Sequence, residues 1–191
     1  MSESIATKQK ILAAANNLFA SNGFDGCSVR DIAKQAEVNL AAINYHFKNK
    51  ENLYWQVFDY NYEFIDAGIK KIGKKDLAIE DFSIEVYRFF IKNRSAMMNT
   101  FKIFLTDNVA PPEEKLSLEK TERFGPPGQE VFLEKIAQEV SAEVSQESQW
   151  WVMKMIFSQL VHFGVIMNTN FICKKIKEGE KDVQPQVIEK S

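Results

Sequence analysis

The feature that most constrains this fold is the recurrence of apolar residues every three to four positions through most of the 191 residues. Such a period is typical of amphipathic helices, and no segment alternates apolar and polar residues as a half-buried strand does. Proline, which interrupts helices, is absent before Pro111. We therefore predict an all-α protein.

Capping and breaking residues divide this pattern into about nine helices. Gly23 follows the first helix, Ser28 and Asp31 have the spacing of a capping box before the second, and Asn39 is a good cap for the third. The pattern breaks again at Pro111-Pro112 and around Gly125–Gly128. The expected helices span 7–21, 29–36, 40–47, a long segment from about 51 to 73, 80–93, 95–107, a short segment at 113–122, 129–143 and 146–172, with a frayed polar tail at 177–191.

Composition and targeting signals place the chain among ordinary globular proteins. It is 45% hydrophobic and 26% charged, which is enough apolar material for a core. The first ten residues are polar, and no stretch reaches the roughly 20 apolar residues that span a bilayer. We therefore expect a cytoplasmic protein with no membrane partner.

The residues that usually carry chemistry are few and scattered. Cys27, Cys173, His46 and His162 are the only cysteines and histidines, and none has metal-ligand spacing. No phosphate-binding loop or nucleophile elbow is present. We expect no metal, no cofactor, no disulfide and no enzymatic activity. Cys27 is expected to be an inert loop thiol, with redox sensing as the alternative.

The strongest functional pattern lies between residues 28 and 47. Two short helices joined by a tight turn, the second opening with small residues, describe a helix-turn-helix. The second helix must enter the major groove of DNA, so its outward-facing side chains near the N-terminus cannot be bulky. The run Leu40-Ala41-Ala42 meets this requirement. The inner face of this helix must be apolar to dock on the other helices, and Val38, Ile43 and Phe47 meet that need.

The segment from Ile11 to Leu53 resembles the DNA-binding domain of the tetracycline-repressor-like (TetR/AcrR) family of bacterial transcription regulators. The resemblance is dense and covers about a quarter of the chain. The matching residues are Ile11–Ala15, Leu18-Phe19, Gly23-Phe24, Ser28–Ala33, Ala36, Val38, Tyr45–Phe47, Lys50 and Leu53. It implies a three-helix DNA-binding head at 1–50 and a helical body for ligand binding and dimerisation at 51–191. The implied function is a repressor released from operator DNA by a small effector.

Two positions depart from the family pattern. Glu37 stands where the turn usually has glycine, and if that position needs a positive φ, a side chain there costs roughly 1 kcal/mol or more. Asn44 stands where many members carry tyrosine. An asparagine can read adenine through two hydrogen bonds, and a phosphate contact is equally compatible with its position.

The resemblance and the side-chain chemistry together suggest how the head meets DNA. Arginine pairs with guanine and small apolar groups touch thymine methyls, whereas hydroxyl, imidazole and ammonium groups bind phosphate. Candidates to face base edges are Arg30, Leu40, Ala41, Ala42 and Asn44, and candidates to contact phosphates are Ser28, Tyr45, His46 and Lys50, with Lys8 a weaker one.

Structural roles are the alternative for several of these residues. Arg30 can simply pair with Asp31 or Glu37 on the surface. Tyr45 can lie at the edge of the core, and Lys50 can be a solvated lysine at a helix start. His46 can be purely structural. The net charge of −2 on its own argues weakly against a nucleic-acid partner. The segment through Trp55 is +1, from six basic and five acidic residues, and this distribution permits DNA binding by the head.

The final helix suggests a second copy of the chain as partner. Apolar residues cover more than one of its faces, and such a helix needs more than its own domain to cover it. An internal core helix is the alternative. The resemblance to the TetR/AcrR family implies that the last two long helices pair with a second copy, and the residues assigned to this homodimer interface are Phe132, Ile136, Val140, Ile156, Leu160, Phe163 and Met167.

Aromatic and methionine residues of the body suggest an adaptable apolar site. No arginine cluster accompanies them, so an apolar effector fits better than a sugar phosphate. Ordinary core packing is the alternative for each. The candidate ligand-binding residues are Phe82, Tyr87, Phe90, Met97, Met98, Phe101, Phe104, Trp150 and His162.

Two other functions compete with a DNA-binding regulator. One is a helical enzyme, which the missing catalytic motifs disfavour. The other is a helical interaction protein whose helix-turn-helix no longer binds DNA, for which Glu37 and the modest basic charge are the best support. DNA affinity and its dependence on salt separate this second case from the main hypothesis.

Overall fold

The computed structural model describes residues 2–106, 109–110, 125–167, 169 and 174, and the expected helix at 113–122 and tail at 177–191 lie outside them. The described part is all-α, as predicted, and contains no strand. Its helices are α1 (Ser2–Asn22), α2 (Val29–Ala36), α3 (Leu40–Phe47), α4 (Lys50–Gly73), α5 (Ile79–Lys92), α6 (Arg94–Thr106), α8 (Gln129–Glu139) and α9 (Gln146–Met167).

Two helix ends differ by more than one residue from the expected ones. α1 begins five residues before the expected Thr7, because the polar residues from Ser2 onward simply continue the helix. α8 ends at Glu139 rather than 143, since Val140 adopts an extended conformation with φ −93° and ψ 154°. The described part of α9 runs from Gln146 to Met167, and residues 168 and 170–172 of the expected helix lie outside the described residues.

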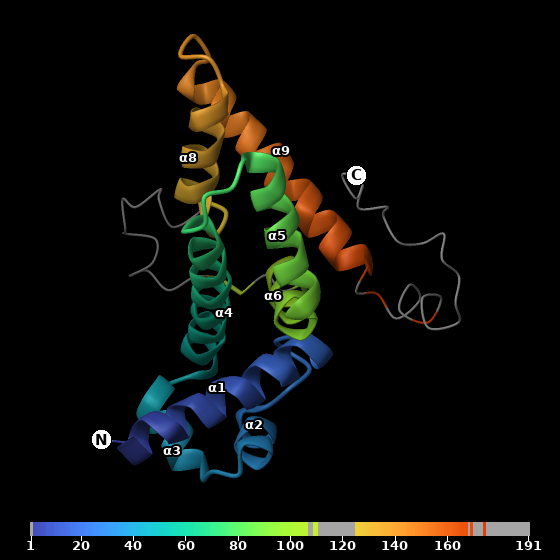
Figure 1. Cartoon of the computed structure of the whole chain (residues 1–191). Helices are drawn as coiled ribbons and strands as arrows, with labels where there is room; N and C mark the ends of the chain where they lie inside the picture. Colours follow the sequence, from blue (N-terminus) through green and yellow to red (C-terminus); the bar gives the residue numbers. More distant parts are fainter. Residues whose placement is uncertain (1, 107–108, 111–124, 168, 170–173, 175–191) are drawn as a thin grey trace.

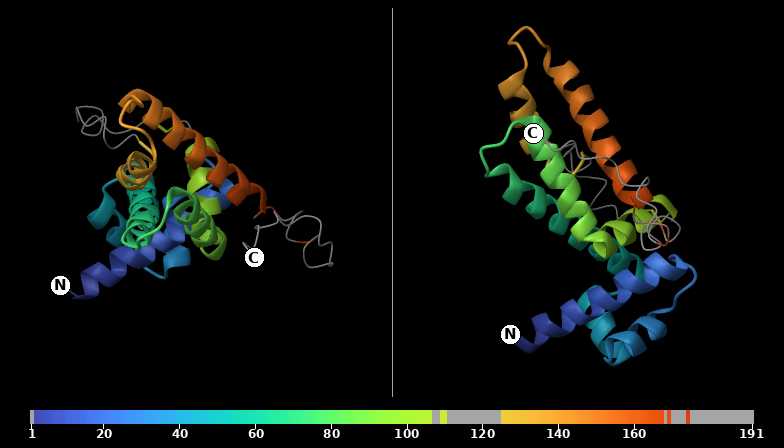
Figure 2. Two further views of the ribbon diagram at one scale, coloured as in Figure 1. Left: turned by 45° about the horizontal axis from the view of Figure 1, so that its top comes forward. Right: turned by 45° about the vertical axis from the view of Figure 1, so that its right-hand side comes forward.

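The molecule has a small head below a taller body (Figure 1). Helices α1, α2 and α3 form the head, and α4 rises from it into the body. There α5 runs beside α4, and α8 and α9 extend upward together to the far end, as the two further views confirm (Figure 2). α6 descends from the body until it meets α1.

The head has its own hydrophobic cluster. Ile11, Phe19, Ile32 and Phe47 are each at most 1% exposed and bring α1, α2 and α3 together. The head cluster does not stop at residue 50, because it also includes four buried residues further along the chain. These residues are Leu53, Tyr54, Val57 and Ile103.

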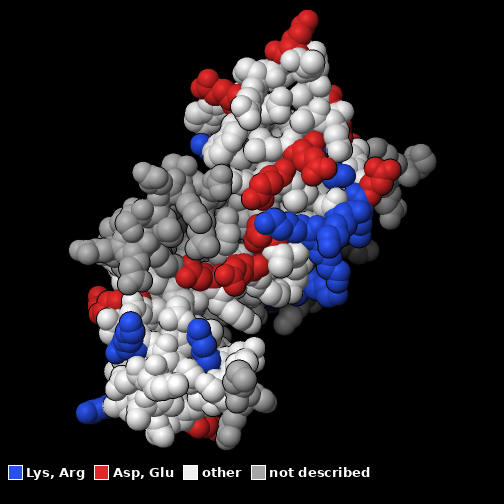
Figure 3. Space-filling model, turned by 90° about the vertical axis from the view of Figure 1, so that its left-hand side faces the viewer, with Lys and Arg blue, Asp and Glu red and all other residues white. Residues whose placement is uncertain are grey.

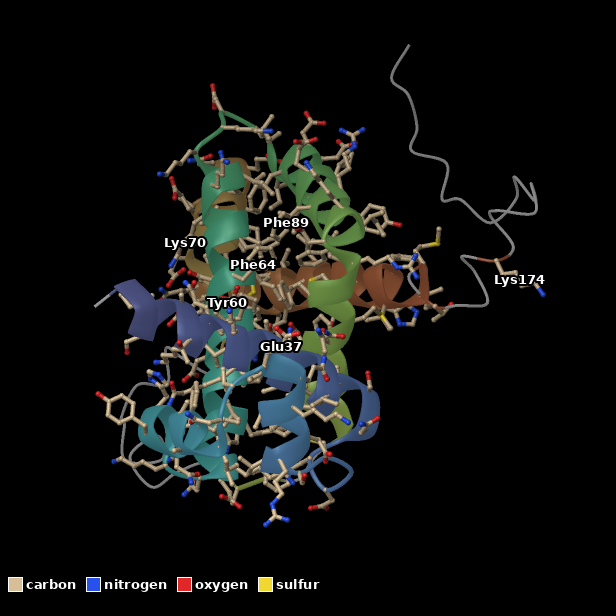
Figure 4. The ribbon with its side chains drawn as sticks, turned by 90° about the horizontal axis from the view of Figure 1, so that it is seen from below. Glu37, Tyr60, Phe64, Lys70, Phe89 and Lys174 are labelled. Atoms are coloured by element: carbon tan, nitrogen blue, oxygen red, sulfur yellow. The ribbon has the colours of Figure 1, made fainter. Side chains whose placement is uncertain are left out.

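A second cluster forms the core of the body. It joins α4, α5, α6, α8 and α9 through fully buried side chains such as Phe82, Phe90, Phe132 and Met153. Helices α4 and α5 approach closely at Gly68, because this residue has no side chain. A Cβ at Gly68 would lie 2.2 Å from the ring of Phe89 on α5. Figure 4, seen from the head end, shows the labelled rings of Phe64 and Phe89 facing each other between these helices, with centroids 5.8 Å apart.

Helix α9 stands out because several of its large apolar side chains are exposed. Trp151 is 59% exposed, Met155 58% and Phe163 46%. Among the described helices, α9 is the one that is long and apolar enough to cross a membrane by length and composition, a test that core helices of soluble proteins also pass. The body therefore exposes an apolar face of α9 to solvent in the single chain.

Candidate nucleic-acid interface

Helix α2 begins at a complete capping box. The Ser28 hydroxyl accepts from the backbone N–H of Asp31 (3.1 Å), and the Asp31 carboxylate accepts from the backbone N–H of Ser28 (2.8 Å). The same carboxylate accepts from the Ser28 hydroxyl at 2.6 Å, and these hydrogen bonds lower the pKa of Asp31 below its usual value. The box fixes the entrance to the helix-turn-helix, as the sequence predicts.

The turn between α2 and α3 is built on a left-handed residue. Glu37 has φ 55° and ψ 43°, and the backbone N–H groups of Glu37 and Val38 return to carbonyls of Lys34 and Ala33. The turn thus keeps the geometry that favours glycine although a glutamate occupies it. Left-handed conformation at a non-glycine residue costs roughly 1–2 kcal/mol, and the surrounding contacts hold the residue there.

Helix α3 separates an inner from an outer face. The Asn39 side chain caps it by accepting from the backbone N–H of Ala42 at 2.7 Å. Ile43 and Phe47 are each 1% exposed and bind it to the head cluster. The outer face presents the remaining residues of the predicted base-reading and phosphate-contacting set. These are Leu40, Ala41, Asn44 and Tyr45, all exposed, with Ala42 and His46 half-buried.

Tyr45 lies on the surface rather than at the edge of the core. Its side chain is 81% exposed, and its ring makes an edge contact with His46, with centroids 5.1 Å apart. The structural alternative for Tyr45 therefore has no support from packing. An exposed tyrosine on the outer face of this helix offers a hydroxyl that can donate to a phosphate oxygen.

Two lysines lie over aromatic rings of the head. The Lys50 ammonium is 4.1 Å from the Phe24 ring centroid, at the start of α4. The Lys8 ammonium is 5.8 Å from the ring of Phe47, where α3 ends. Ring faces hold a cation without neutralising its charge, so both ammonium groups keep hydrogen-bond donors for phosphate. From the sequence, Lys8 is only a weaker candidate, because its nearness to α3 depends on how α1 packs.

Ser28 and Arg30 differ in how their side chains are engaged. Ser28 is exposed, but its hydroxyl already serves the capping box. Arg30 is exposed and, within the described residues, forms no ion pair with Asp31 or Glu37. Its guanidinium is thus available to an external partner, whereas a phosphate contact by Ser28 has to share the cap.

The charge distribution agrees with a modest basic contribution from the head. Figure 3 shows separated lysine or arginine side chains on a largely uncharged head surface, while acidic and basic side chains crowd together on the body. The body charges pair with one another, for example Lys75 with Glu85 at 2.8 Å and Lys70 with Asp66 at 2.9 Å. The largest group of basic side chains in this view lies on the body, so the charge distribution permits DNA binding by the head but does not single the head out.

The candidate ligand-binding residues occupy several different environments. Phe82, Phe90 and Met97 are at most 1% exposed and pack in the body core. Half-buried positions are taken by Tyr87, Met98, Phe101 and Trp150; His162 is exposed, and Phe104 lies in α6 with its side chain outside the described set. Burial raises the pKa of the Tyr87 phenol. Three helices of the body thus bring most of these residues to one core.

The candidate dimer residues divide into an inner and an outer group. Phe132 and Ile136 of α8 are at most 2% exposed in the single chain and pack in its core. Val140, Ile156, Leu160 and Met167 are half-buried, and Phe163 is exposed. The exposed apolar face of α9 adds residues that the candidate set lacks, chiefly Trp151, Met155 and Ile166. Which faces of α8 and α9 point inward depends on packing, which the apolar spacing alone does not specify.

Comparison with known proteins separates the head from the body. Residues 11–57 match the model of the family described as bacterial regulatory proteins, tetR family. The chain is 53% identical over 49 residues to the probable HTH-type transcriptional regulator YttP of Bacillus subtilis, covering 26% of this chain and 24% of YttP. It is 34% identical over 95 residues to the biofilm operon icaADBC negative transcriptional regulator IcaR of Staphylococcus aureus, covering 48% of this chain and 50% of IcaR.

The whole fold also has solved counterparts. The fatty acid degradation regulator FadR of Bacillus halodurans aligns with a TM-score of 0.65 and 17% identity, over 93% of this chain and 88% of FadR. The similarity in sequence is concentrated where the helix-turn-helix lies, and the similarity in fold extends through the body.

Among the described residues, no group of three or more histidine, cysteine or acidic side chains is placed to hold a metal ion.

Proposed function

This chain belongs to the TetR family of bacterial regulatory proteins, and on that premise we propose that it is a sequence-specific DNA-binding transcription regulator, a repressor released from its operator by a small, mainly apolar effector. The observation that carries the proposal is the outer face of α3, where Tyr45 is 81% exposed and Leu40, Ala41 and Asn44 are exposed as well. Repression is supported by the similarity to IcaR, which is described as a negative transcriptional regulator and of which the match covers 50%.

In this proposal residues 1–50 bind DNA and residues 51–191 bind the effector and a second copy of the chain. The exposed apolar residues of α9 support a homodimer, because covering them removes a large apolar area from water. Two copies related by a two-fold axis suit an inverted-repeat operator with half-sites about 34–36 Å apart. The protein acts in the cytoplasm as a binding protein, with no catalysis, metal, cofactor or membrane partner.

DNA binding is tested by selecting sites from random duplexes with the full chain, then titrating the enriched duplex at two salt concentrations. We expect an inverted repeat whose affinity falls at least about tenfold in Tyr45→Ala and in Lys50→Ala, with the Lys50 variant lowering the salt slope by about one. Tyr60→Ala and Lys71→Ala are matched controls, since both residues are exposed on α4 away from α3. Equal losses in the controls, or no enriched sequence, would refute the proposal.

The dimer is tested by sedimentation of Phe163→Glu, which puts a charge on the exposed face of α9. We expect the wild type to sediment as a dimer and the variant as a folded monomer. Ile91→Glu, at an exposed apolar position of α5, is the control and should remain dimeric. A monomeric wild type would exclude this interface.

The effector is tested by thermal shift with a panel of fatty acids, aromatic compounds and sugar phosphates. We expect stabilisation by at least one apolar class, by an amount that grows with ligand concentration. A ligand that stabilises the protein should also weaken operator binding, because an effector shifts the equilibrium only through its different affinity for the two states. Stabilisation by sugar phosphates alone would reverse the expected effector class.

A further inference from the structure

The head cluster and the body cluster both draw on helix α4, and a polar residue separates their contributions. Val57 is fully buried in the head cluster, and Ile65, eight residues later on the same face, is 2% exposed in the body cluster. Asn61 lies halfway between them and is itself only 2% exposed. The apolar stripe of α4 is therefore interrupted where the two clusters meet.

Helix α6 repeats this arrangement in the opposite direction. Met97 is buried in the body cluster and Ile103 in the head cluster. Between them Thr100 is 8% exposed, and its hydroxyl donates to the carbonyl of Ala96 at 2.7 Å. Within the described residues the buried polar side chains are Asn61, Thr100 and Lys135, so two of the three lie at the boundary between the clusters.

Helix α1 contributes two consecutive asparagines at the same level. The Asn61 amide donates to the side-chain oxygen of Asn16 at 3.0 Å, and the Asn99 amide of α6 donates to that of Asn17 at 3.3 Å. Figure 1 shows α1 crossing the lower parts of α4 and α6, where these bonds form. We call Asn16, Asn17, Asn61, Asn99 and Thr100 the joint layer.

The chemistry of the joint layer differs from that of the cores on either side. Apolar contact is non-directional, so two apolar helix faces can slide with little change in buried area. An amide pair holds one geometry, and an unmade bond at a buried amide costs about 1–3 kcal/mol. A buried asparagine between helices is a known way to fix register at some expense of stability.

We propose that the joint layer sets the angle of the head on the body and thereby the half-site spacing that a dimer of this chain accepts. This inference rests on the proposed function, because spacing has meaning only for a dimer that binds an inverted repeat. Asn16, Asn17, Asn61 and Asn99 are positioning residues: they lie away from α3 and act on DNA through the orientation of the head.

The test compares the wild type with Asn61→Leu and Asn99→Ala, each as the full chain. Affinity is measured for the selected inverted repeat, for repeats lengthened or shortened by one base pair between the half-sites, and for a single half-site. We expect the preference for the selected spacing to fall about fivefold or more in Asn61→Leu and less in Asn99→Ala. Affinity for the single half-site should stay within about twofold, because the outer face of α3 is unchanged.

Lys135→Met is the matched control, since it also removes a buried polar group but lies in the body, where its ammonium donates to the Lys75 carbonyl at 3.1 Å. It should keep the wild-type spacing preference.

Unchanged preference in both asparagine variants would overturn the inference while leaving the proposed function intact. An equal loss on half-site and full site would also overturn it, because that marks a damaged head. If Asn61→Leu does not fold, Asn99→Ala, at a partly exposed position, decides alone. Absence of any inverted-repeat binding by the wild type would refute the proposed function itself and this inference with it.

Discussion

Helices α2 and α3 of the head, and α4 that leads out of it, are capped by residues next to them in the sequence, whereas α5 and α8 of the body are capped by residues far away in the chain. Helices α2, α3 and α4 follow Ser28, Asn39 and Asn49, and each of these side chains accepts a backbone N–H three residues later. Helices α5 and α8 follow Ala78 and Gly128, and neither residue provides a side-chain cap.

Distant carboxylates replace the missing caps in the body. Glu139 of α8 accepts from the backbone N–H of Ile79 at 2.5 Å, and Asp66 of α4 accepts from that of Gly128 at 2.8 Å. Helix α9 is intermediate, since Ser145 accepts from the backbone N–H of Ser148 at 3.2 Å. The head can therefore define its helix starts before the chain is packed, while α5 and α8 gain theirs only in the assembled body.

The largest effect that separates the two regions is expected from Gly128→Ala. Gly128 has φ 73°, and an added Cβ would lie 2.3 Å from Ile69 of α4. Left-handed strain and overpacking together should lower the free energy of unfolding by about 2–4 kcal/mol. Chemical unfolding at a fixed protein concentration measures this loss, and Ser141→Ala at an exposed site is the control. A loss no larger than that of the control would mean that α8 tolerates a shift away from α4.

A smaller loss is expected when a distant cap is removed. Glu139→Ala leaves the first turn of α5 without its carboxylate, and loss of an N-cap costs about 0.5–2 kcal/mol. Ser28→Ala removes a local cap and should lower the free energy of unfolding by a similar amount. Because this cap is local, Ser28→Ala should also lower the helicity of an isolated peptide of residues 26–48, measured by circular dichroism. A peptide of residues 77–93 lacks Glu139 altogether, so its helicity should rise on Ala78→Ser. If it does not, the comparison between local and distant caps fails.

The head should become more stable when its turn regains glycine. Glu37 has φ 55°, so Glu37→Gly relieves the left-handed strain and is expected to raise the free energy of unfolding by up to about 1 kcal/mol. Gly gains extra freedom in the unfolded chain, which offsets part of the gain. Thermal unfolding measures the change, and Glu63→Gly within α4 should destabilise as a control. Lower stability in Glu37→Gly would show that the glutamate side chain makes a compensating contribution.

The smallest effect is expected in how the stability of the protein changes at acidic pH. Hydrogen bonds from the Ser28 hydroxyl and backbone lower the folded-state pKa of Asp31 below its ordinary value of 3.8. A lowered carboxyl pKa contributes stability above the unfolded-state pKa, and that contribution is lost as the pH falls through 3.8 toward the folded value. Asp31→Asn should therefore show a shallower loss of stability over this acidic range than the wild type. Parallel pH profiles would mean that the box does not depend on the charge of Asp31.

The part of the site that follows from local chemistry is predicted well from the sequence. The bounds of α3, the capping box at Ser28 and the cap at Asn39 are confirmed, because each depends on residues within a few positions of one another. The fold class is confirmed for the same reason, since the helical period is a local pattern repeated along the chain. The assignments of DNA, ligand and dimer contacts to individual residues stay predictions.

What the sequence alone determined is which segments are helical, where the head begins and ends its helices, and which face of α3 is polar. Those features depend on spacing and caps, which act over a turn or two of helix. Only the tertiary structure decided that α6 meets α1, that Asn16 pairs with Asn61, and that α9 keeps an apolar face exposed. Such pairings join residues tens of positions apart, and the free energy of packing that selects them belongs to the assembled chain rather than to any one segment.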